Sequence, residues 1–225
     1  MSADRERVAV IGGTGAEGMG LALRWAGEGI DVVIGSRDEQ RAQNTADEVR
    51  NIISGARCSG AENGAAAASA GTVVVAVPFA GQAAIYRSIA EHIDAESVVV
   101  DCTAPLATAV GGRASHVLGV WHGSAAQQAS ALLGGTTPVC CAFHTLSAAA
   151  LRDLEQDLEG DVLVCGPKSA KPAVRRLVEA LPQLRFVDAG PLENARLIEP
   201  LTALVVGLNR RYGTDRAGIR ITGLP

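Results

Sequence analysis

Aromatic side chains are the scarcest class in this chain of 225 residues, because phenylalanine, tyrosine and tryptophan together make up only 3% of it. This scarcity excludes an interior built on large rings. Since 48% of the residues are hydrophobic, the core must be packed mainly from valine, leucine, isoleucine and alanine. Such side chains are typical of the buried strands of parallel sheets.

The chain also lacks an excess of positive charge and long apolar runs. The formal net charge is −4, and a general nucleic-acid or membrane-surface protein needs a basic field instead. No run approaches the roughly 18 apolar residues of a membrane span, and residues 1–7 are too charged for a signal peptide. We therefore expect a cytoplasmic protein without nucleic-acid or membrane partners.

Cysteine is sparse and has no metal-binding spacing. The five cysteines form no C-x-x-C pair and lie mostly in apolar, strand-like runs. Buried thiols usually act as small hydrophobic side chains, so the spacing predicts neither a metal site nor a redox pair. The cysteines are Cys58, Cys102, Cys140, Cys141 and Cys165.

Short β-branched runs alternate with amphipathic stretches along the chain. This alternation is typical of an α/β fold with a doubly wound parallel sheet. The predicted strands are residues 7–13, 31–37, 72–78, 97–103, 138–144, 161–167 and 184–191, with a weaker one at 56–60. The predicted helices between them include residues 37–53, 62–71, 80–93 and 124–133.

The chain is predicted to divide near residue 145. Residues 1–145 fit a Rossmann domain, and residues 146–225 fit a small C-terminal α/β domain with helices at 146–158, 168–181 and 193–211. Pro200 is expected to kink or divide the last helix, because proline lacks a backbone donor and its ring crowds the preceding turn.

A glycine motif follows the first predicted strand. Gly13, Gly15 and Gly18 match G-x-G-x-x-G at a strand-to-helix turn. The first glycine allows the tight turn, the second lets the backbone approach a pyrophosphate, and the third lets helix and strand pack closely. A turn that binds nothing can use the same glycines, but its position in the first βα unit favours a dinucleotide. Glu17 is expected to point away from the phosphates.

The end of the second predicted strand favours NADP over NAD. An NAD-binding protein places an acid there for the ribose hydroxyls, whereas this chain has Ser36 and Arg37, with Arg41 one helical turn later and Thr14 in the adjacent loop. A hydroxyl and guanidinium groups suit a 2′-phosphate. The alternative is a pair of exposed arginines at the start of a helix.

Three further loops follow later strands, at residues 77–79, 103–105 and 144–146, where a nicotinamide lies in a doubly wound sheet. His144 is their one titratable side chain, either bonding to a bound ring or satisfied within the core. His92, His116 and His122 are expected on the surface or in loops.

Five stretches, in the same order over nearly the whole chain, carry a resemblance to a known family: IGGTGAEGMGLALR, VVIGSRDEQRA, AVPF, AFHTLSAA and FVDAGPLENARLIEPLTALVVGLNRRYG. With these stretches the chain resembles the NADP-dependent oxidoreductases of the deazaflavin coenzyme F420. The resemblance implies a Rossmann domain with a small second domain, pairing as homodimers, and direct hydride transfer between NADPH and the deazaflavin.

The motif and the resemblance together imply two binding surfaces. The deazaflavin is expected against His144, Leu146, Ala148 and Ala217. NADP is expected against Gly13, Thr14, Gly15, Ala16, Glu17, Gly18, Ser36, Arg37, Arg41, Val77, Pro78, Phe79 and Ala104.

Hydride transfer between two rings requires close stacking and exclusion of water, with little proton transfer by the protein. We therefore predict no catalytic acid or base. Two alternatives remain: a reductase of imines or carbonyls of the pyrroline-carboxylate or 6-phosphogluconate type, and a non-catalytic NADPH-binding module. The acidic tail of the deazaflavin has candidate partners in Arg152, Lys168, Lys171, Arg210 and Arg211, which are otherwise solvated helix charges.

The last predicted helix is apolar around most of its circumference, and a second domain of about 80 residues offers little to bury it against. A partner subunit would cover it, which predicts a homodimer. The apolar residues are Leu197, Ile198, Leu201, Leu204, Val205 and Leu208.

Overall fold

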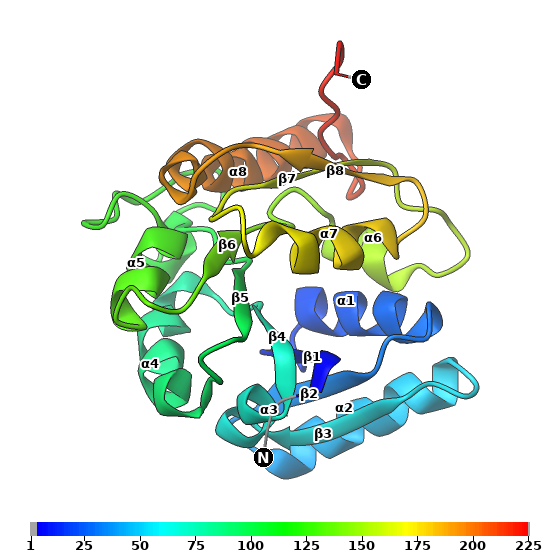
Figure 1. Ribbon diagram of the computed structural model, residues 1–225. Helices are drawn as coiled ribbons and strands as arrows, with labels where there is room; N and C mark the ends of the chain where they lie inside the picture. The colour runs from blue at the N-terminus through cyan, green and yellow to red at the C-terminus, as the bar shows by residue number, and fades with distance from the viewer. Residues whose placement is uncertain (1–3, 225) are drawn as a thin grey trace.

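The computed structural model describes residues 4–224, and it contains a six-stranded parallel sheet with the order β3-β2-β1-β4-β5-β6 (Figure 1). This is the strand order of the Rossmann fold, so the predicted doubly wound sheet is confirmed. Residues 1–3 of the charged N-terminal segment lie outside the described residues. The strands are β1 (Asp4–Ile11), β2 (Val32–Ser36), β3 (Cys58–Glu62), β4 (Ala70–Val75), β5 (Val98–Asp101) and β6 (Val139–Cys141).

Helices cover both faces of this sheet. One face is covered by α1 (Ala16–Gly27), α2 (Glu39–Ile52), α6 (Ala148–Arg152) and α7 (Lys171–Glu179), and the other by α3 (Asn63–Ala68), α4 (Phe79–Ile89), α5 (Ala125–Leu132) and the start of α8 (Ala195–Tyr212). Side chains alternate along each strand, so Val8 and Val10 belong to one apolar cluster while Ala9 and Ile11 belong to the other. Short 3-10 turns are η1 (Ala90–His92), η2 (Ala107–Val110) and η3 (Leu192–Asn194).

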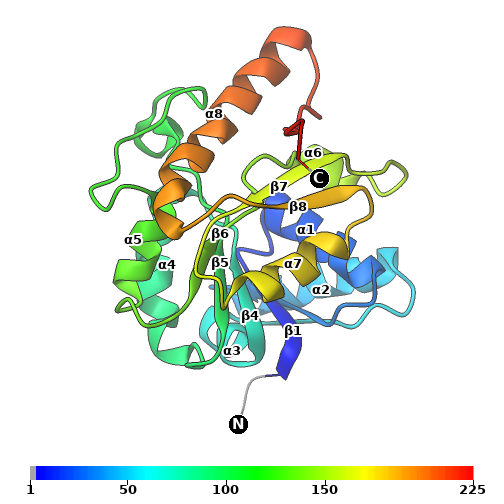
Figure 2. The same cartoon turned by 45° about the horizontal axis from the view of Figure 1, so that its top comes forward.

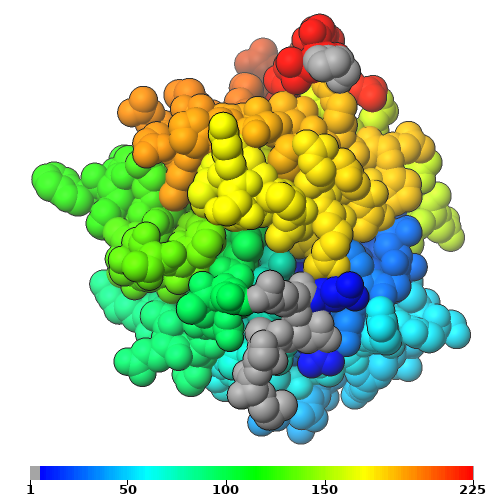
Figure 3. Space-filling view, in the orientation of Figure 1, coloured from blue at the N-terminus to red at the C-terminus, as the bar shows by residue number. Residues whose placement is uncertain are grey.

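The C-terminal part adds a second, two-stranded parallel sheet, β7 (Gly160–Val164) and β8 (Leu184–Asp188), which α7 connects. An antiparallel bridge between Cys141 and Cys165 joins the two sheets, and the Trp25 indole of α1 donates to the Leu177 carbonyl of α7 at 2.9 Å. Figure 3 shows the yellow and orange C-terminal residues packed directly over the blue and green N-terminal ones. One apolar cluster therefore includes side chains from both parts.

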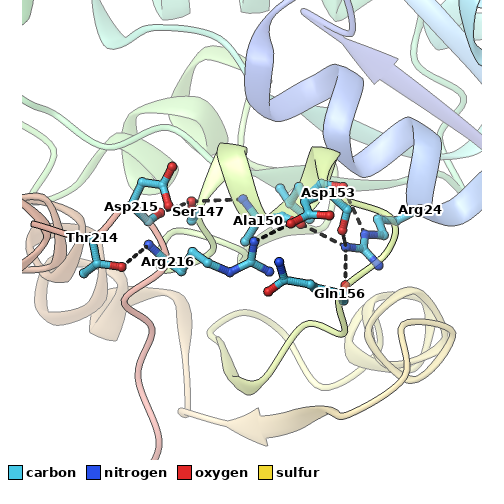
Figure 4. A network of polar contacts seen from close by, with 9 residues as sticks. Arg24, Ser147, Ala150, Asp153, Gln156, Thr214, Asp215 and Arg216 are labelled. Atoms are coloured by element: carbon cyan, nitrogen blue, oxygen red, sulfur yellow. Dashed lines mark hydrogen bonds and ion pairs between the residues drawn. The ribbon is translucent and has the colours of Figure 1, made fainter.

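The helix predicted at 146–158 is wrong beyond Arg152. The structure has only the short α6, whose start is capped by the Ser147 hydroxyl. The Arg24 guanidinium donates to the Leu151 carbonyl at 3.0 Å, to the Ala150 carbonyl at 2.9 Å and to the Gln156 carbonyl at 2.9 Å (Figure 4). Because the last carbonyls of α6 accept hydrogen bonds from Arg24 of α1, they need no donor from a further helical turn, and the helix ends at Arg152.

Helix α8 is continuous through Pro200, so the predicted division of this helix is wrong, whereas the alternative, a kink at Pro200, stays a prediction (Figure 2). Proline at this position removes only the donor for the Arg196 carbonyl, within the second turn. Leu197 and Leu204 project from α8 as exposed side chains, while Ile198 and Val205 are buried. Within residues 4–224, no helix combines the length and the apolar composition that crossing a membrane requires.

Candidate functional site

The turn between β1 and α1 contains four glycines, and the surroundings of each are different. Gly12 has φ +82°, and a Cβ there would lie 2.5 Å from the Ala76 carbonyl oxygen. The tight turn therefore depends on Gly12, not on Gly13 as the motif predicted. Gly13 is restricted by packing instead, because its Cβ would lie 2.8 Å from the Val10 carbonyl oxygen. The left-handed residue of the turn is therefore one position before the first glycine of the G-x-G-x-x-G motif.

Gly18 plays the predicted steric role, whereas the approach of a pyrophosphate to Gly15 stays a prediction. A Cβ at Gly18 would lie 2.5 Å from the Gly12 carbonyl oxygen, so helix and strand pack too closely for any side chain. At Gly15 the nearest atom is the same oxygen at 3.2 Å, and no other heavy atom lies within 4 Å. Gly15 is also the N-cap of α1, and no side chain caps this end. The space beside Gly15 is therefore open, as an anion site at a helix N-terminus requires.

A cavity of about 710 Å³ opens at this turn, along the carboxyl ends of β1, β2 and β4. Seven of the predicted NADP residues line it: Thr14, Gly15, Ser36, Arg37, Arg41, Val77 and Pro78. Six predicted residues do not line it: Gly13, Ala16, Glu17, Gly18, Phe79 and Ala104. The remaining lining residues are Gly12, Asp38, Glu62, Asn63, Ala76, Gly81, Ala84, Ile85 and Ser88.

One wall of the cavity carries the two arginines. The Ser36 hydroxyl accepts from the Asp38 amide at 3.2 Å, and the Asp38 carboxylate caps α2 by accepting from the Arg41 amide at 3.2 Å. Neither Arg37 nor Arg41 forms an ion pair with another residue of the 4–224 range. Both guanidinium groups are exposed at the cavity and remain available to an anion.

The wall formed by the end of β3 was not predicted from the sequence. Asn63 is only 2% exposed, and its Oδ1 has no hydrogen-bond partner among the residues the structure describes. A buried acceptor without a partner is costly, so a bound donor in this cavity would satisfy it. The position of Glu62 and Asn63 after a strand was the available signal, but the weak strand was predicted to end at residue 60.

A buried polar network lies at the end of β5. The Asp101 carboxylate accepts from the Tyr86 hydroxyl at 2.7 Å, the Gln82 amide at 2.9 Å and the Thr103 amide at 3.0 Å. Burial raises the pKa of Asp101 to about 6. Burial and then the Asp101 charge raise the pKa of Glu17 to about 8. The charge of Asp101, at the end of β5, therefore contributes to the raised pKa of Glu17.

His144 is held within the core. It is 6% exposed, with Nε2 at 3.1 Å from the Thr103 carbonyl oxygen and Nδ1 at 3.6 Å from the Cys141 sulfur. Burial lowers its pKa to about 4, so the ring is neutral at pH 7. Both nitrogens face protein atoms, which is the satisfied core arrangement. His92, His116 and His122 are exposed, and all five cysteines are buried thiols, as predicted.

A second, smaller cavity of about 280 Å³ lies between α6 and the segment after α8. Leu146 and Ala217 line it, whereas His144 and Ala148 do not. The Arg216 guanidinium donates to the Asp153 carboxylate at 2.8 Å, and the Ser147 hydroxyl donates to the Asp215 carbonyl (Figure 4). These bonds hold the C-terminal segment beside α6, which places residues 146 and 217 in one wall.

The candidate cations for an acidic tail fall into two groups. Lys168, Arg210 and Arg211 are exposed. Lys171 is buried, forms an ion pair with Asp188 and donates to the Gly190 carbonyl at 2.9 Å. Its ammonium group is therefore not free to bind an acidic tail. Arg152 is half-exposed and lies 3.9 Å from a Glu48 oxygen.

Comparisons with known proteins give relatives over nearly the whole chain. Residues 7–105 match the family model described as NADP oxidoreductase coenzyme F420-dependent. The F420-dependent NADP reductase of Methanothermobacter thermautotrophicus is 41% identical over 223 residues, covering 97% of this chain and 96% of the relative. The enzyme of that name from Methanocaldococcus jannaschii is 34% identical over 223 residues, covering 97% of this chain and 99% of the relative.

Solved structures share the fold. A crystal structure from Arthrobacter sp. FB24 superposes with a TM-score of 0.81 at 23% identity, covering 97% of this chain and all of that one. The pyrroline carboxylate reductase of Plasmodium falciparum gives a TM-score of 0.57 at 12% identity, and the match covers 94% of this chain but only 68% of that one. At these identities the likeness concerns the fold alone. The full-length identity to curated relatives decides the family, and this chain belongs to the F420-dependent NADP reductases.

Proposed function

We propose that this protein transfers a hydride directly between NADP(H) and coenzyme F420. The observation that carries the proposal is the cavity at the uncapped N-terminus of α1, where the free guanidinium groups of Arg37 and Arg41 stand beside Ser36. A helix N-terminus binds a pyrophosphate, and guanidinium groups bind a 2′-phosphate. The full-length relatives carry the name of this activity.

NADP would occupy the larger cavity. Thr14 and Gly15 would contact the pyrophosphate, with Gly13, Ala16, Glu17 and Gly18 shaping the turn. Asn63 Oδ1 supplies an acceptor for a donor of the nucleotide. Val77, Pro78, Phe79 and Ala104 follow the strands toward which the nicotinamide extends.

The deazaflavin would lie beyond that edge, toward the smaller cavity with Leu146 and Ala217. Ala148 and His144 belong to the adjoining segments, and His144 would contribute a ring carbon because both its nitrogens face protein atoms. Residues 1–145 would then form the NADP-binding domain and residues 146–225 the cap over the deazaflavin.

The two cofactors supply the hydride donor and acceptor carbons when bound. The chain positions the rings and excludes water from them, which is what direct transfer requires. Asp101 is fully enclosed by Tyr86, Gln82 and Thr103, so it supports the end of β5 without reaching a substrate. No side chain is required to accept or donate a proton for the hydride to move.

The test is a spectroscopic assay with purified protein, NADPH and oxidised coenzyme F420. Loss of the deazaflavin absorption band on addition of NADPH supports the proposal. Turnover of a cyclic imine without any change in the deazaflavin would favour the imine-reductase alternative. Tight NADPH binding with neither reaction would favour a binding module.

Cofactor preference provides a second prediction. Wild-type protein should favour NADPH over NADH by at least tenfold, about 1.4 kcal/mol, because only the 2′-phosphate can use the charge-assisted bonds of Arg37. Arg37→Ala should raise the KM for NADPH about tenfold and leave the KM for NADH nearly unchanged. Steady-state kinetics with both cofactors measures this, and equal efficiency in the wild type would contradict the assignment.

The third prediction concerns assembly in the cytoplasm. We propose a homodimer in which α8 contributes to the interface, because Leu204 is 53% exposed and Leu197 is 64% exposed on this helix. Leu204→Asp should convert dimers to monomers in light scattering. The matched control is Ile52→Asp, which changes a side chain 49% exposed at the end of α2. A wild-type monomer, or equal behaviour of the two variants, would reject this interface.

A further inference from the structure

Three potential metal ligands converge in the core behind the proposed cofactor site. Cys141 ends β6, His144 follows three residues later, and Glu199 comes from α8. All three side chains are buried. The Cys141 sulfur, a ring nitrogen of His144 and a carboxylate oxygen of Glu199 all lie within 4.8 Å of one another.

We propose that Cys141, His144 and Glu199 form a buried site for a divalent cation of the zinc type. Zinc–sulfur bonds are about 2.3 Å and zinc–nitrogen bonds about 2.0 to 2.1 Å, so a tetrahedral ion separates the two ligand atoms by about 3.6 Å. The Cys141 sulfur and His144 Nδ1 are 3.6 Å apart. The two ligands are therefore already spaced for one ion.

Neighbouring groups orient each ligand as in known metal sites. His144 Nε2 lies 3.1 Å from the Thr103 carbonyl oxygen, and in the tautomer that donates to this oxygen the Nδ1 lone pair is left for an ion beside Cys141. The Glu199 oxygens accept from the Ala125 and Ala126 amides at 2.8 and 2.9 Å. These amides begin α5, and the Ser124 hydroxyl also bonds to the carboxylate, so Glu199 is held at a helix N-terminus.

The mixture of ligands indicates which ion would bind. Thiolate and imidazole favour Zn²⁺ or Co²⁺, whereas Ca²⁺ and Mg²⁺ prefer oxygen ligands only. Three protein ligands are enough for a zinc site that keeps one position open. Such an ion would join the end of β6 to α8. The cysteine spacing did not predict this site, because Glu199 is distant in sequence.

The simpler alternative is a hydrogen bond from the Cys141 thiol to His144, which explains the same short distance without a metal. The two arrangements differ in one respect: only a metal site converts the thiol to a thiolate bound to the ion. Co²⁺ distinguishes them, because a cobalt–thiolate bond gives a charge-transfer absorption in the near ultraviolet that a hydrogen bond cannot give.

The experiment uses full-length protein expressed with added Co²⁺, so that the ion is present while the buried site forms. We expect one cobalt per chain by elemental analysis, with a thiolate charge-transfer band that Zn²⁺ removes by displacement. Cys141→Ala should lose the band and the metal, and Glu199→Gln should weaken Co²⁺ retention about tenfold against a chelator. The band reports the metal whether or not the protein turns over coenzyme F420.

The matched control is Cys140→Ala, the adjacent thiol, which belongs to the apolar cluster on the opposite face of the sheet. It should keep both the metal and the band. Circular dichroism checks that each variant is folded, and Cys141→Ser replaces Cys141→Ala if the latter is not. Wild-type protein with no more cobalt than Cys141→Ala, or equal loss of the band in Cys140→Ala, would overturn the site and leave the hydrogen bond.

Discussion

Replacing Gly15 with valine is expected to abolish NADPH binding in a chain that still folds. The added side chain would project from the N-cap of α1 into the cavity, where the pyrophosphate must approach the backbone. We expect at least a hundredfold loss of affinity, about 2.8 kcal/mol. Titration calorimetry with NADPH measures the loss, and circular dichroism reports the fold.

The structure explains why the fold should tolerate this change. Gly15 has φ −85° and ψ 166°, an extended conformation that valine adopts readily, and its nearest obstacle is one carbonyl oxygen at 3.2 Å. Gly18→Val should instead prevent folding, because its Cβ would meet the Gly12 carbonyl at 2.5 Å. Gly27→Ala, at the other end of α1, is the control and should bind NADPH normally. Tight binding by Gly15→Val would reject the pyrophosphate assignment.

The sheet was predictable from the sequence because its strands are buried on both faces. Such strands are apolar at nearly every position, as residues 72–78 are, so they are easily recognised in the sequence. Each of them is followed by a helix. The strand order then follows from the doubly wound pattern. What the sequence could not show is where tertiary contacts end an element. Helix α6 stops after Arg152 because Arg24, more than a hundred residues away, takes its last carbonyls.

The candidate site was predictable where it depends on strand ends. Ser36 is the last residue of β2 and Arg37 follows it directly, so their place at the edge of the sheet is a consequence of topology. Asn63 and Ser88 were missed because the rotation of a short or covered helix decides which side chain faces the cavity. The surroundings of His144 were not predictable either, because its ring nitrogens contact Thr103 and Cys141 only in the folded chain.

Asp161→Ala is expected to cause a large loss of stability in a chain that still folds, although Asp161 lines neither cavity. This buried carboxylate on β7 accepts from Arg185 Nε at 2.9 Å, from Arg185 Nη2 at 2.8 Å and from the Ile221 amide at 2.6 Å. It thereby ties β8 and the C-terminal segment to β7. Charged hydrogen bonds of this kind are worth about 2 to 3 kcal/mol, so we expect the Tm to fall by about 5 to 10 °C.

The pH dependence of that loss separates the ion pair from a simple packing defect. Arg185 holds the pKa of Asp161 below its ordinary value of 3.8, so the pair stabilises the folded state fully above pH 3.8 and progressively less as the pH falls through the lower folded-state pKa. Urea denaturation at a series of pH values measures the free energy of unfolding of both proteins. The difference between wild type and Asp161→Ala should decrease as the pH falls below 3.8. Glu159→Ala is the matched control, because its ion pair with Arg220 is solvent-exposed and should contribute little. If the difference in the free energy of unfolding stays constant down to the lowest pH measured, lost packing rather than lost charge accounts for the effect.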